Sequence, residues 1–403
     1  MKIGLVVPGF SKSESDWCIP ALLGLVRRLA ERDEVHVFTL RYPKPRRTYS
    51  VYGATVHAAA GGFARGLGRV PMLARTFRSI GREHRRAPFH VLHGFWADEP
   101  GFVAVRAARR LEVPAVVTLL GGELVALPEI RYGSQLSYVN RVLVRHALAS
   151  AARVTAGSRY LAKLAEPWVS PDRLHQLPLG VDTKLFRPET PRDERPPLRE
   201  GDIPLLHVAS LVPVKNQAMI LRALARVAAR APAVHLHIVG EGPLRRELEQ
   251  LADALGVRSR LTFHGAVLHH HLPAYYRAAR LCVMGSRHEG QEWVTLEAAA
   301  CGRPTVGTAV GLVPDLEPVT RAVPVGDDEA LAAAVSSSLA EASATGERSR
   351  AARLRIERDY SLDATVEQLR SLYQETFHQF RGAPPPRSLR DSLRSRCARA
   401  EGS

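Results

Sequence analysis

The chain has 403 residues, too many for one ordinary hydrophobic core, and this length fits about two domains of roughly 100–200 residues each. With 45% hydrophobic and 24% charged residues, and no apolar run near the ~20 residues that span a bilayer, the composition is that of a globular protein and excludes a transmembrane helix. The formal charge of +16 indicates either an anionic partner (nucleic acid, an acidic membrane surface or a phosphate-bearing substrate) or a compositional bias toward arginine.

The N-terminal residues 1–8 contain an apolar run that is too short for a signal peptide, so they are predicted to form a first β-strand. The cysteines are widely scattered and lack the spacing of metal ligands: Cys18, Cys282, Cys301 and Cys397. Reduced thiols in a cytoplasmic protein are therefore expected.

The first half of the chain alternates short β-branched runs with longer amphipathic segments. Helices are predicted at residues 19–29 and 102–111, and strands at residues 3–7, 34–40, 90–94, 115–120 and 152–156. Continuous apolar strands that alternate with helices indicate a parallel sheet covered on both faces.

Residues 187–202 carry charge and proline but almost no apolar side chains, which predicts a linker. The alternation then starts again, with strands predicted at residues 205–209, 236–239, 261–264, 281–284 and 305–306. The predicted fold class is α/β, with two Rossmann-like, doubly wound parallel-sheet domains. Ligands are expected in the cleft between them, beyond the carboxyl ends of the strands.

The expected division is an N-terminal domain at residues 1–186 and a C-terminal domain at residues 203–360. Residues 361–380 have apolar side chains at helical spacing and are predicted to cross back to the first domain. Residues 382–403 are rich in proline, arginine and serine, which predicts a disordered basic tail.

Residues 61–86 contain seven arginines and one acidic residue, interleaved with apolar side chains. A basic amphipathic helix of this kind can lie on an anionic membrane. Its apolar stripe can equally pack against the N-terminal sheet, with the arginines solvated, and both interpretations stay open.

The segment with the strongest chemical signal is residues 286–304. Glu289 is predicted on the loop that follows a strand, and Glu297 about two turns into a helix that begins near Trp293. The N-terminus of a helix suits a pyrophosphate, and two carboxylates beside it can accept hydrogen bonds from sugar or ribose hydroxyls.

This segment resembles the motif of two glutamates separated by seven residues in retaining GT-B glycosyltransferases, specifically glycosyltransferase family 4, group 1. Four other blocks are similar to that family and follow its order: residues 179–182, 208–216, 237–244 and 261–265. The similarity is clearest over residues 150–310 and extends more weakly to residue 380. It implies a GT-B fold and a hexosyltransferase that retains the anomeric configuration of a nucleotide-diphosphate-sugar donor without a cofactor.

Carried over by position, the resemblance implies that Glu289 contacts the transferred sugar and Glu297 the nucleoside ribose. Lys215 would neutralise the diphosphate leaving group, on which negative charge develops. This fold type uses no metal for that task. No Asp-x-Asp pair is placed to hold a divalent ion, so a metal-independent reaction is expected.

The resemblance also implies a set of donor contacts from loops. The backbone amides of Gly290, Gln291 and Glu292, at the helix start, would hold sugar hydroxyls or phosphate. The remaining positions on the donor side are Gly240, Gly242 and Ser210. Ser210 stands where the family has arginine. Gln291 and Glu292 replace a phenylalanine and a small residue, which alters the expected sugar pocket.

On the acceptor side, residues of two loops are expected to face the cleft: Gly9, Gly121, Gly122 and Glu123. Leu120 stands where the family often carries a histidine near the reacting sugar. His93, at a predicted strand end facing the same cleft, is a candidate partial substitute, although such a histidine can also be structural. The histidines at 269–271 are expected on a solvated surface, since three adjacent side chains cannot all face one ion.

Neither the donor base and sugar nor the acceptor can be read from the sequence, and a lipid-linked sugar, a polysaccharide and a small metabolite all stay open as acceptors. The alternatives to a transferase are a GT-B phosphorylase or epimerase, a donor-binding but inactive relative, and a basic nucleic-acid-binding α/β protein. The last lacks a recognition module or an aromatic stacking platform. The expected location is the cytoplasm, with peripheral contact at the inner face of the cell membrane.

Overall fold

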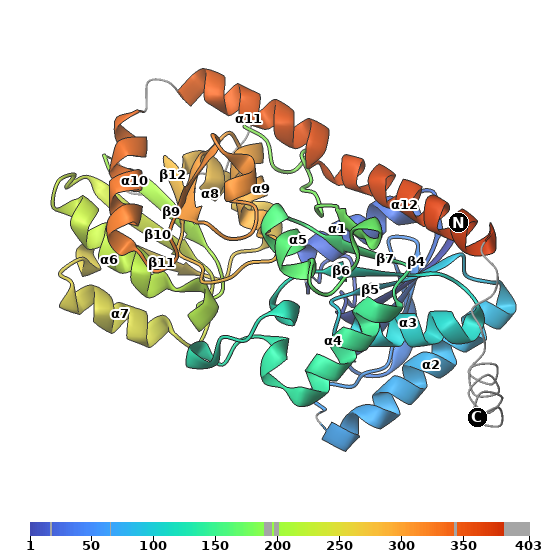
Figure 1. Cartoon of the computed structure of the whole chain (residues 1–403). Coiled ribbons are helices and arrows are strands. Elements are labelled where there is room, and N and C mark those ends of the chain that lie inside the picture. Colours follow the sequence, from blue (N-terminus) through green and yellow to red (C-terminus); the bar gives the residue numbers. More distant parts are fainter. Residues whose placement is uncertain (17, 65, 189–195, 197–200, 342–344, 383–403) are drawn as a thin grey trace, which may run out of the picture.

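The computed structural model describes residues 1–16, 18–64, 66–188, 196, 201–341 and 345–382. The expected basic tail from residue 383 onward lies outside this description, as do residues 189–195 and 197–200 of the expected linker. Figure 1 shows two α/β domains side by side, with a pair of helices running along both of them.

The N-terminal domain is built on an eight-stranded sheet in the order β3-β4-β2-β1-β5-β6-β7-β8. Its strands are β1 (Lys2–Gly9), β2 (Glu34–Tyr42), β3 (Arg47–Val51), β4 (Ala54–Ala58), β5 (Val91–Phe95), β6 (Ala115–Leu119), β7 (Arg153–Ala156) and β8 (Leu174–Gln176). Only the pair of β3 and β4 is antiparallel among these strands. The central strands are apolar and buried along their length, as expected of parallel strands with both faces covered.

Helices cover both faces of this sheet. Helix α1 (Pro20–Ala30) packs on one face together with the last helix, α12 (Leu362–Gly382). The other face is covered by α2 (Arg69–Arg86), α3 (Glu99–Leu111), α4 (Tyr138–Ser150) and α5 (Arg159–Ala165). Each of these helices buries an apolar stripe against the sheet, and this burial stabilises the layered arrangement.

The C-terminal domain has a six-stranded parallel sheet in the order β11-β10-β9-β12-β13-β14. Its strands are β9 (Ile203–Val208), β10 (Val234–Val239), β11 (Leu261–Gly265), β12 (Leu281–Met284), β13 (Thr305–Thr308) and β14 (Thr320–Val323). One face is covered by α6 (Gln217–Ala228), α7 (Arg245–Ala254) and α10 (Asp328–Ala340). The other is covered by α8 (Leu272–Ala278), α9 (Trp293–Ala300) and α11 (Thr345–Asp359).

The chain returns from the C-terminal to the N-terminal domain through α11 and α12, which run along the top of both domains in Figure 1. Arg353 of α11 donates to the backbone carbonyls of Thr183 and Phe186, in the segment that leaves the N-terminal domain, and to that of Ala300 at the end of α9. Leu362 N–H donates to the Val181 carbonyl at 2.8 Å. The outgoing and returning segments of the chain are therefore held side by side.

The prediction of two doubly wound α/β domains is confirmed, and each strand predicted from an apolar run is present. The sequence missed β3, β4, β8 and β14. β3 is an edge strand whose side chains at Arg47, Thr48 and Ser50 are exposed, so it carries no apolar run to detect. No helix among the described residues is long and apolar enough to cross a membrane.

Candidate functional site

The loop between β12 and α9 brings Glu289 to a lysine from another loop of the same domain. Lys215 Nζ lies 2.5 Å from Glu289 Oε1, and Ser286 Oγ donates to the same oxygen at 2.7 Å. The glutamate side chain is 10% exposed and the lysine side chain 26% exposed. An ammonium group has three donors, so Lys215 can hold this carboxylate and still donate to a bound anion.

Lys215 is positioned by the turn that follows β9. It ends a short 3-10 helix, and Asn216 takes a left-handed φ of 47° before α6 begins at Gln217. The Gln217 side chain donates to the Ser210 carbonyl at 3.0 Å and so closes the turn. Every residue of this turn is described by the structure. Because Ser210 carries no charge, the cation of the turn is Lys215.

Glu297 lies on α9 and is the better buried of the two glutamates, with a side chain 6% exposed. It accepts hydrogen bonds from Tyr276 Oη at 2.7 Å and from His269 Nε2 at 2.9 Å. Burial, with the charge of Glu297, raises the pKa of Tyr276, which keeps the phenol a donor. Each carboxylate oxygen has a second lone pair, so Glu297 can accept further hydrogen bonds.

The contact with Glu297 corrects the expectation for the three consecutive histidines. His270 and His271 are exposed, as expected, but His269 is partly buried and faces Glu297. The sequence could not reveal this, because the two residues are 28 positions apart and meet only through the packing of α8 against α9.

The glycines of the loop after β10 let its backbone approach the loop after β9. A Cβ at Gly240 would lie 2.0 Å from the Ala209 carbonyl oxygen, and one at Gly242 would lie 2.4 Å from that of Leu211. Gly240 also has a φ of 131°, which favours glycine. The packing of the two loops therefore requires both glycines, whatever ligand lies beside them.

The N-terminal domain touches the loop that carries Glu289. A Cβ at Gly290 would lie 2.5 Å from the carbonyl carbon and oxygen of Leu120, so the two backbones are in direct contact. His288 Nε2 donates to the Gly121 carbonyl at 3.0 Å, and its Nδ1 accepts from Tyr160 Oη at 3.1 Å. Burial lowers the pKa of His288, so the imidazole is neutral. No local sequence pattern marks His288, because both of its partners belong to the other domain.

The side chains of Gln291 and Glu292 point into packed surroundings. Gln291 pairs with the backbone of Leu179, from which its Oε1 accepts at 2.8 Å and to which its Nε2 donates. Both oxygens of Glu292 accept from Leu312 N–H at 3.0 Å. These two side chains are therefore structural, while none of the described residues accepts from the backbone N–H groups of Gly290 and Gln291.

The charge state of Glu292 follows from its surroundings. Burial, together with the nearby charge of Glu289, raises the pKa of Glu292 from 4.5 to about 8. At neutral pH its carboxyl group is thus mostly protonated. The carboxylate that pairs with Lys215 is that of Glu289.

Among the residues expected on the acceptor side, Glu123 is turned inward. Its carboxyl oxygens accept from Leu120 N–H at 3.0 Å and Gly121 N–H at 2.6 Å, and burial raises its pKa to about 7. Glu123 therefore shapes the turn at Gly121 and Gly122, which the structure places against the loop of Gly290. Gly9 is buried at the end of β1.

His93 does not face the cleft, contrary to the prediction from the sequence. It is fully buried inside β5, where Nδ1 lies 2.6 Å from Tyr373 Oη on α12 and Nε2 lies 2.6 Å from Thr118 Oγ1. Burial lowers its pKa to about 3. His93 thus links the sheet to the returning helix, and this position excludes direct contact with a substrate in the cleft.

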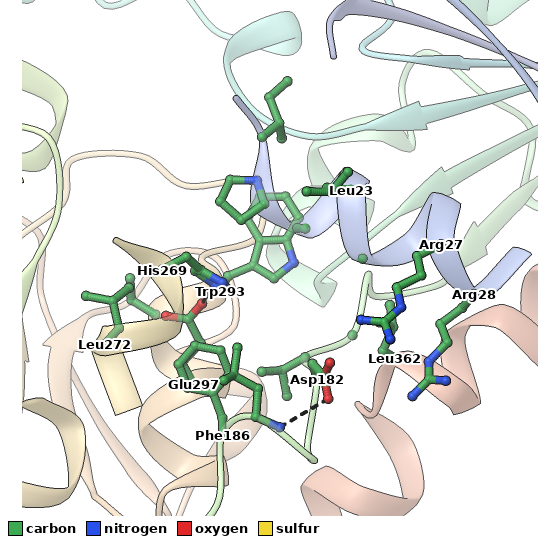
Figure 2. Close-up of a pocket in the computed structure, with 18 of the residues that line it drawn as sticks. Leu23, Arg27, Arg28, Asp182, Phe186, His269, Leu272, Trp293, Glu297 and Leu362 are labelled. Carbon is green, nitrogen blue, oxygen red and sulfur yellow. Dashed lines mark hydrogen bonds and ion pairs between the residues drawn. The ribbon is translucent and has the colours of Figure 1, made fainter. Parts of the chain in front are cut away.

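A cavity of about 260 Å³ lies beside Glu297, between α1 and the C-terminal domain (Figure 2). Figure 2 shows the apolar side chains of Trp293 and Phe186 in its lining, together with Leu23 and Arg27 of α1. Glu289 and Lys215 do not line it. Of the two glutamates, Glu297 is therefore the one that lines this cavity.

The described residues include a group that could hold a metal ion, and it lies in the N-terminal domain rather than near Glu289: His36, His57 and Glu83. His36 Nδ1 and His57 Nε2 are 3.1 Å apart. Glu83 already forms ion pairs with Arg82 and Arg86. Because these arginines occupy and neutralise the carboxylate, the geometry favours a hydrogen-bonded histidine pair over a cation site.

Two family models match the chain. Residues 21–185 match the model described as "Glycosyltransferase Family 4", and residues 203–341 match the one described as "Glycosyl transferases group 1". The two matches fall on the eight-stranded and the six-stranded domain, respectively.

Similar proteins include the D-inositol 3-phosphate glycosyltransferase of Geodermatophilus obscurus, 34% identical over 312 residues, which are 71% of this chain and 68% of that protein. The D-inositol 3-phosphate glycosyltransferase of Frankia alni is 34% identical over 57% of this chain and 59% of its own length. The GDP-mannose-dependent alpha-(1-6)-phosphatidylinositol monomannoside mannosyltransferase of Mycolicibacterium smegmatis is 36% identical over 50% of this chain. That match spans 57% of the mannosyltransferase, so the chain matches between 57% and 68% of these relatives' length.

Similar solved structures cover nearly the whole chain. Sucrose-phosphate synthase from Thermosynechococcus elongatus has a TM-score of 0.72 at 21% identity, over 94% of this chain and all of that one. Anabaena HepE in complex with UDP-glucose has a TM-score of 0.70 at 18% identity, over 93% of this chain and 100% of that one. This likeness confirms the predicted GT-B fold.

Proposed function

Because the chain belongs to the group 1 glycosyltransferases of family 4, we propose that it transfers a sugar from a nucleotide-diphosphate-sugar to an acceptor hydroxyl. The observation that carries this proposal is the ion pair of Lys215 with Glu289, followed by Glu297 on the next helix. An anion-binding lysine and two carboxylates at the ends of parallel strands suit a ligand with a diphosphate at its centre and hydroxyl groups on both sides.

In the proposed reaction, the bond between the anomeric carbon and the diphosphate oxygen breaks, and the electron pair leaves with the nucleoside diphosphate. The acceptor hydroxyl bonds to the same carbon on the same face, and its proton passes to the leaving phosphate oxygen. The anomeric configuration is thereby retained. Lys215 stabilises the negative charge that develops on the diphosphate, and Glu289 orients the sugar by accepting from its hydroxyls.

We assign the nucleoside end of the donor to Glu297, which accepts from the ribose. The N–H groups of Gly290 and Gln291, at the start of α9, are the proposed donors to the sugar or the phosphate. The cations and N–H groups of the chain would serve the role that a metal has in other transferases, so we propose that the reaction is metal-independent.

We propose that each of the two domains binds one of the two substrates. Residues 203–360 would hold the donor, and residues 1–186, with the helix at 361–380, would hold the acceptor. The relatives from Geodermatophilus and Mycolicibacterium are named for acceptors that contain an inositol bearing a phosphate group. A phosphate-bearing acceptor also fits the formal charge of +16. We therefore propose an acceptor of that class.

We further propose a cytoplasmic protein that contacts the inner face of the membrane through α2 and α4. Five apolar side chains of this region are exposed: Phe63 (96%), Val70 (57%), Tyr138 (74%), Val139 (51%) and Val142 (49%). Arg69 donates to Asn140, which links the two helix starts.

Flotation with vesicles of phosphatidylcholine and phosphatidylglycerol tests this membrane contact. A Val70→Ser/Tyr138→Ser variant should lose binding, and wild-type binding in that variant would refute it.

Incubation of the chain with UDP-, GDP- and ADP-sugars, combined with a thermal-shift panel of the free nucleotides, tests the proposed function. We expect one base to raise the melting temperature and its sugar conjugate to be consumed. Addition of a chelator should leave the rate unchanged, and product NMR should show the donor's anomeric configuration. A nucleotide that binds without turnover would instead indicate an inactive relative, and salt-sensitive nucleic-acid binding without nucleotide binding would indicate the nucleic-acid alternative.

A further inference from the structure

A second cavity, of about 310 Å³, lies on the flank of the N-terminal domain between α2 and the strands β3 and β4. It shares no lining residue with the cavity beside Glu297. Its polar lining contains four arginines, three hydroxyl side chains and one histidine: Arg46, Arg47, Arg75, Arg82, Thr48, Thr76, Ser79 and His57. The reaction proposed above uses none of them.

The arginines come from two separate elements that meet at this cavity. Arg46 precedes β3 and Arg47 begins it, whereas Arg75 and Arg82 lie two turns apart on α2 and therefore on one face of that helix. Antiparallel pairing places Thr48 opposite His57, on the same face of the sheet. The fold thus gathers cationic and hydroxyl donors from residues that the sequence separates.

Little negative charge balances these arginines. Glu83, which adjoins Arg82, is shared between Arg82 and Arg86. Within the described part of the chain, Arg46 and Arg75 form no ion pair, and Arg75 Nε is buried without a hydrogen-bond partner. A buried donor without an acceptor is rare in folded proteins. The cavity therefore has unused donors and a positive charge.

The cation at this cavity is arginine and not histidine. Burial, with the neighbouring His36, lowers the pKa of His57 to about 4, so its imidazole is neutral at physiological pH. Arginine stays charged throughout this range, and its planar group presents paired N–H donors that match the oxygens of a phosphate.

We propose that this cavity binds the phosphate group of an anionic ligand, with Arg46 and Arg75 as its principal donors. Arg47 and Arg82 add positive charge, and the hydroxyls of Thr48 and Ser79 supply neutral donors at the same wall. The phosphate can belong to a soluble metabolite or to a lipid headgroup, since the recognising groups are the same. This site is independent of the donor site and of the proposed reaction.

Titration calorimetry with inorganic pyrophosphate tests the proposal on four forms of the full chain. They are the wild type, Arg46→Gln/Arg75→Gln, Lys215→Ala, and the control Arg78→Gln/Arg85→Gln, which removes the same charge from two positions of α2 that do not line the cavity. Arg46→Gln/Arg75→Gln should weaken pyrophosphate binding about tenfold or more, because it removes charge-assisted hydrogen bonds. The control and Lys215→Ala should keep a site of wild-type affinity.

Co-sedimentation of the same forms with vesicles of phosphatidylcholine, with and without phosphatidic acid, distinguishes the two sources of phosphate. Loss of pyrophosphate affinity in Arg46→Gln/Arg75→Gln with unchanged sedimentation supports a soluble ligand, and loss of both pyrophosphate affinity and sedimentation with phosphatidic acid vesicles supports a headgroup. Unchanged pyrophosphate affinity in that variant would overturn the proposal. Equal losses in both double variants would show a response to overall charge, and loss only in Lys215→Ala would place the anion at the donor site; either overturns the proposal. If the glutamine variant does not fold, Arg46→Lys/Arg75→Lys, which keeps the charge but not the paired donors, replaces it.

Discussion

The side chain of Gln291 pairs with the backbone of Leu179, 112 residues away, through two hydrogen bonds that cross from one domain to the other. Gln291 belongs to the loop of Glu289 in the C-terminal domain, and Leu179 packs in the core of the N-terminal domain. Because a Cβ at Gly157 would lie 2.0 Å from Gln291 Oε1, the amide occupies a space that only a glycine neighbour leaves open. The loop that carries the candidate catalytic glutamate is thus held by both domains.

Replacement of Gln291 by methionine should destabilise the chain. The change keeps the volume but leaves the N–H and the carbonyl of Leu179 buried without partners, at a cost of about 1–3 kcal/mol for each unsatisfied group. Thermal unfolding measures the effect as a lower Tm. Gln374→Met, at an exposed position of α12, is the matched control and should unfold like the wild type. An unchanged Tm for Gln291→Met would show that the pair contributes nothing.

The two glutamates of the site should give different kinetic effects. Glu289→Gln keeps the shape of the side chain but removes the charge that Lys215 and the sugar face, so kcat should fall by about 10²–10³-fold, as when a preorganised polar group is lost. Glu297→Gln should chiefly raise KM for the donor, since Glu297 is assigned to binding. Steady-state kinetics on both variants check this division, and a reversed pattern would exchange their roles.

Lys215→Met should weaken the binding of the diphosphate more than that of the nucleoside. The lysine lies beside Glu289 and is assigned to the phosphates, so its loss removes a charge-assisted hydrogen bond. Inhibition by the nucleoside diphosphate should weaken about tenfold or more. Inhibition by the nucleoside of the same base should stay the same and serves as the internal control. A parallel loss for both inhibitors would argue for a general disturbance of the pocket.

Glu292 predicts a specific pH dependence of stability. Its pKa rises from 4.5 to about 8 on folding, so the folded chain binds the proton more tightly than the unfolded chain. The free energy of unfolding should therefore fall as the pH rises from about 4.5 to about 8. The pKa of Glu123 is also raised, to about 7, so Glu123 likewise makes the free energy of unfolding fall as the pH rises.

Glu292→Gln isolates this contribution. Glutamine stays neutral, so the variant does not lose stability in this way as the pH rises. The Tm of Glu292→Gln minus the Tm of the wild type should therefore increase from about pH 4.5 to about pH 8, measured in buffers of constant ionic strength. Glu129→Gln, at an exposed site of the N-terminal domain, should follow the wild type at every pH. A constant difference between Glu292→Gln and the wild type would contradict the raised pKa.

His93→Phe should lower stability without removing transfer. Both ring nitrogens of His93 are bonded within the N-terminal core, to Tyr373 and Thr118, and the variant leaves those hydroxyls without their partner. Because we assign His93 a structural role only, we expect a lower Tm but a kcat per folded molecule near that of the wild type. A folded variant that has lost activity would restore His93 as a candidate for catalysis.

The sequence by itself determined the two α/β domains and the local setting of the two glutamates. Apolar runs mark strands buried on both faces, because hydrophobic burial requires continuous apolar residues in a parallel sheet. The start of α9 at Trp293 follows from the same local pattern. The edge strand β3 escaped detection, since its exposed side chains leave no such run.

Only the tertiary structure decided which side chains meet. His93 looked like a cleft residue because it is near a strand end, but the return of α12 buries it against Tyr373. His269 looked solvated, but the packing of α8 on α9 brings it to Glu297. The contacts of His288 and Gln291 join parts of the chain more than 100 residues apart. Local sequence patterns reflect the periodicity of burial within an element, whereas these contacts depend on how elements from both domains pack together.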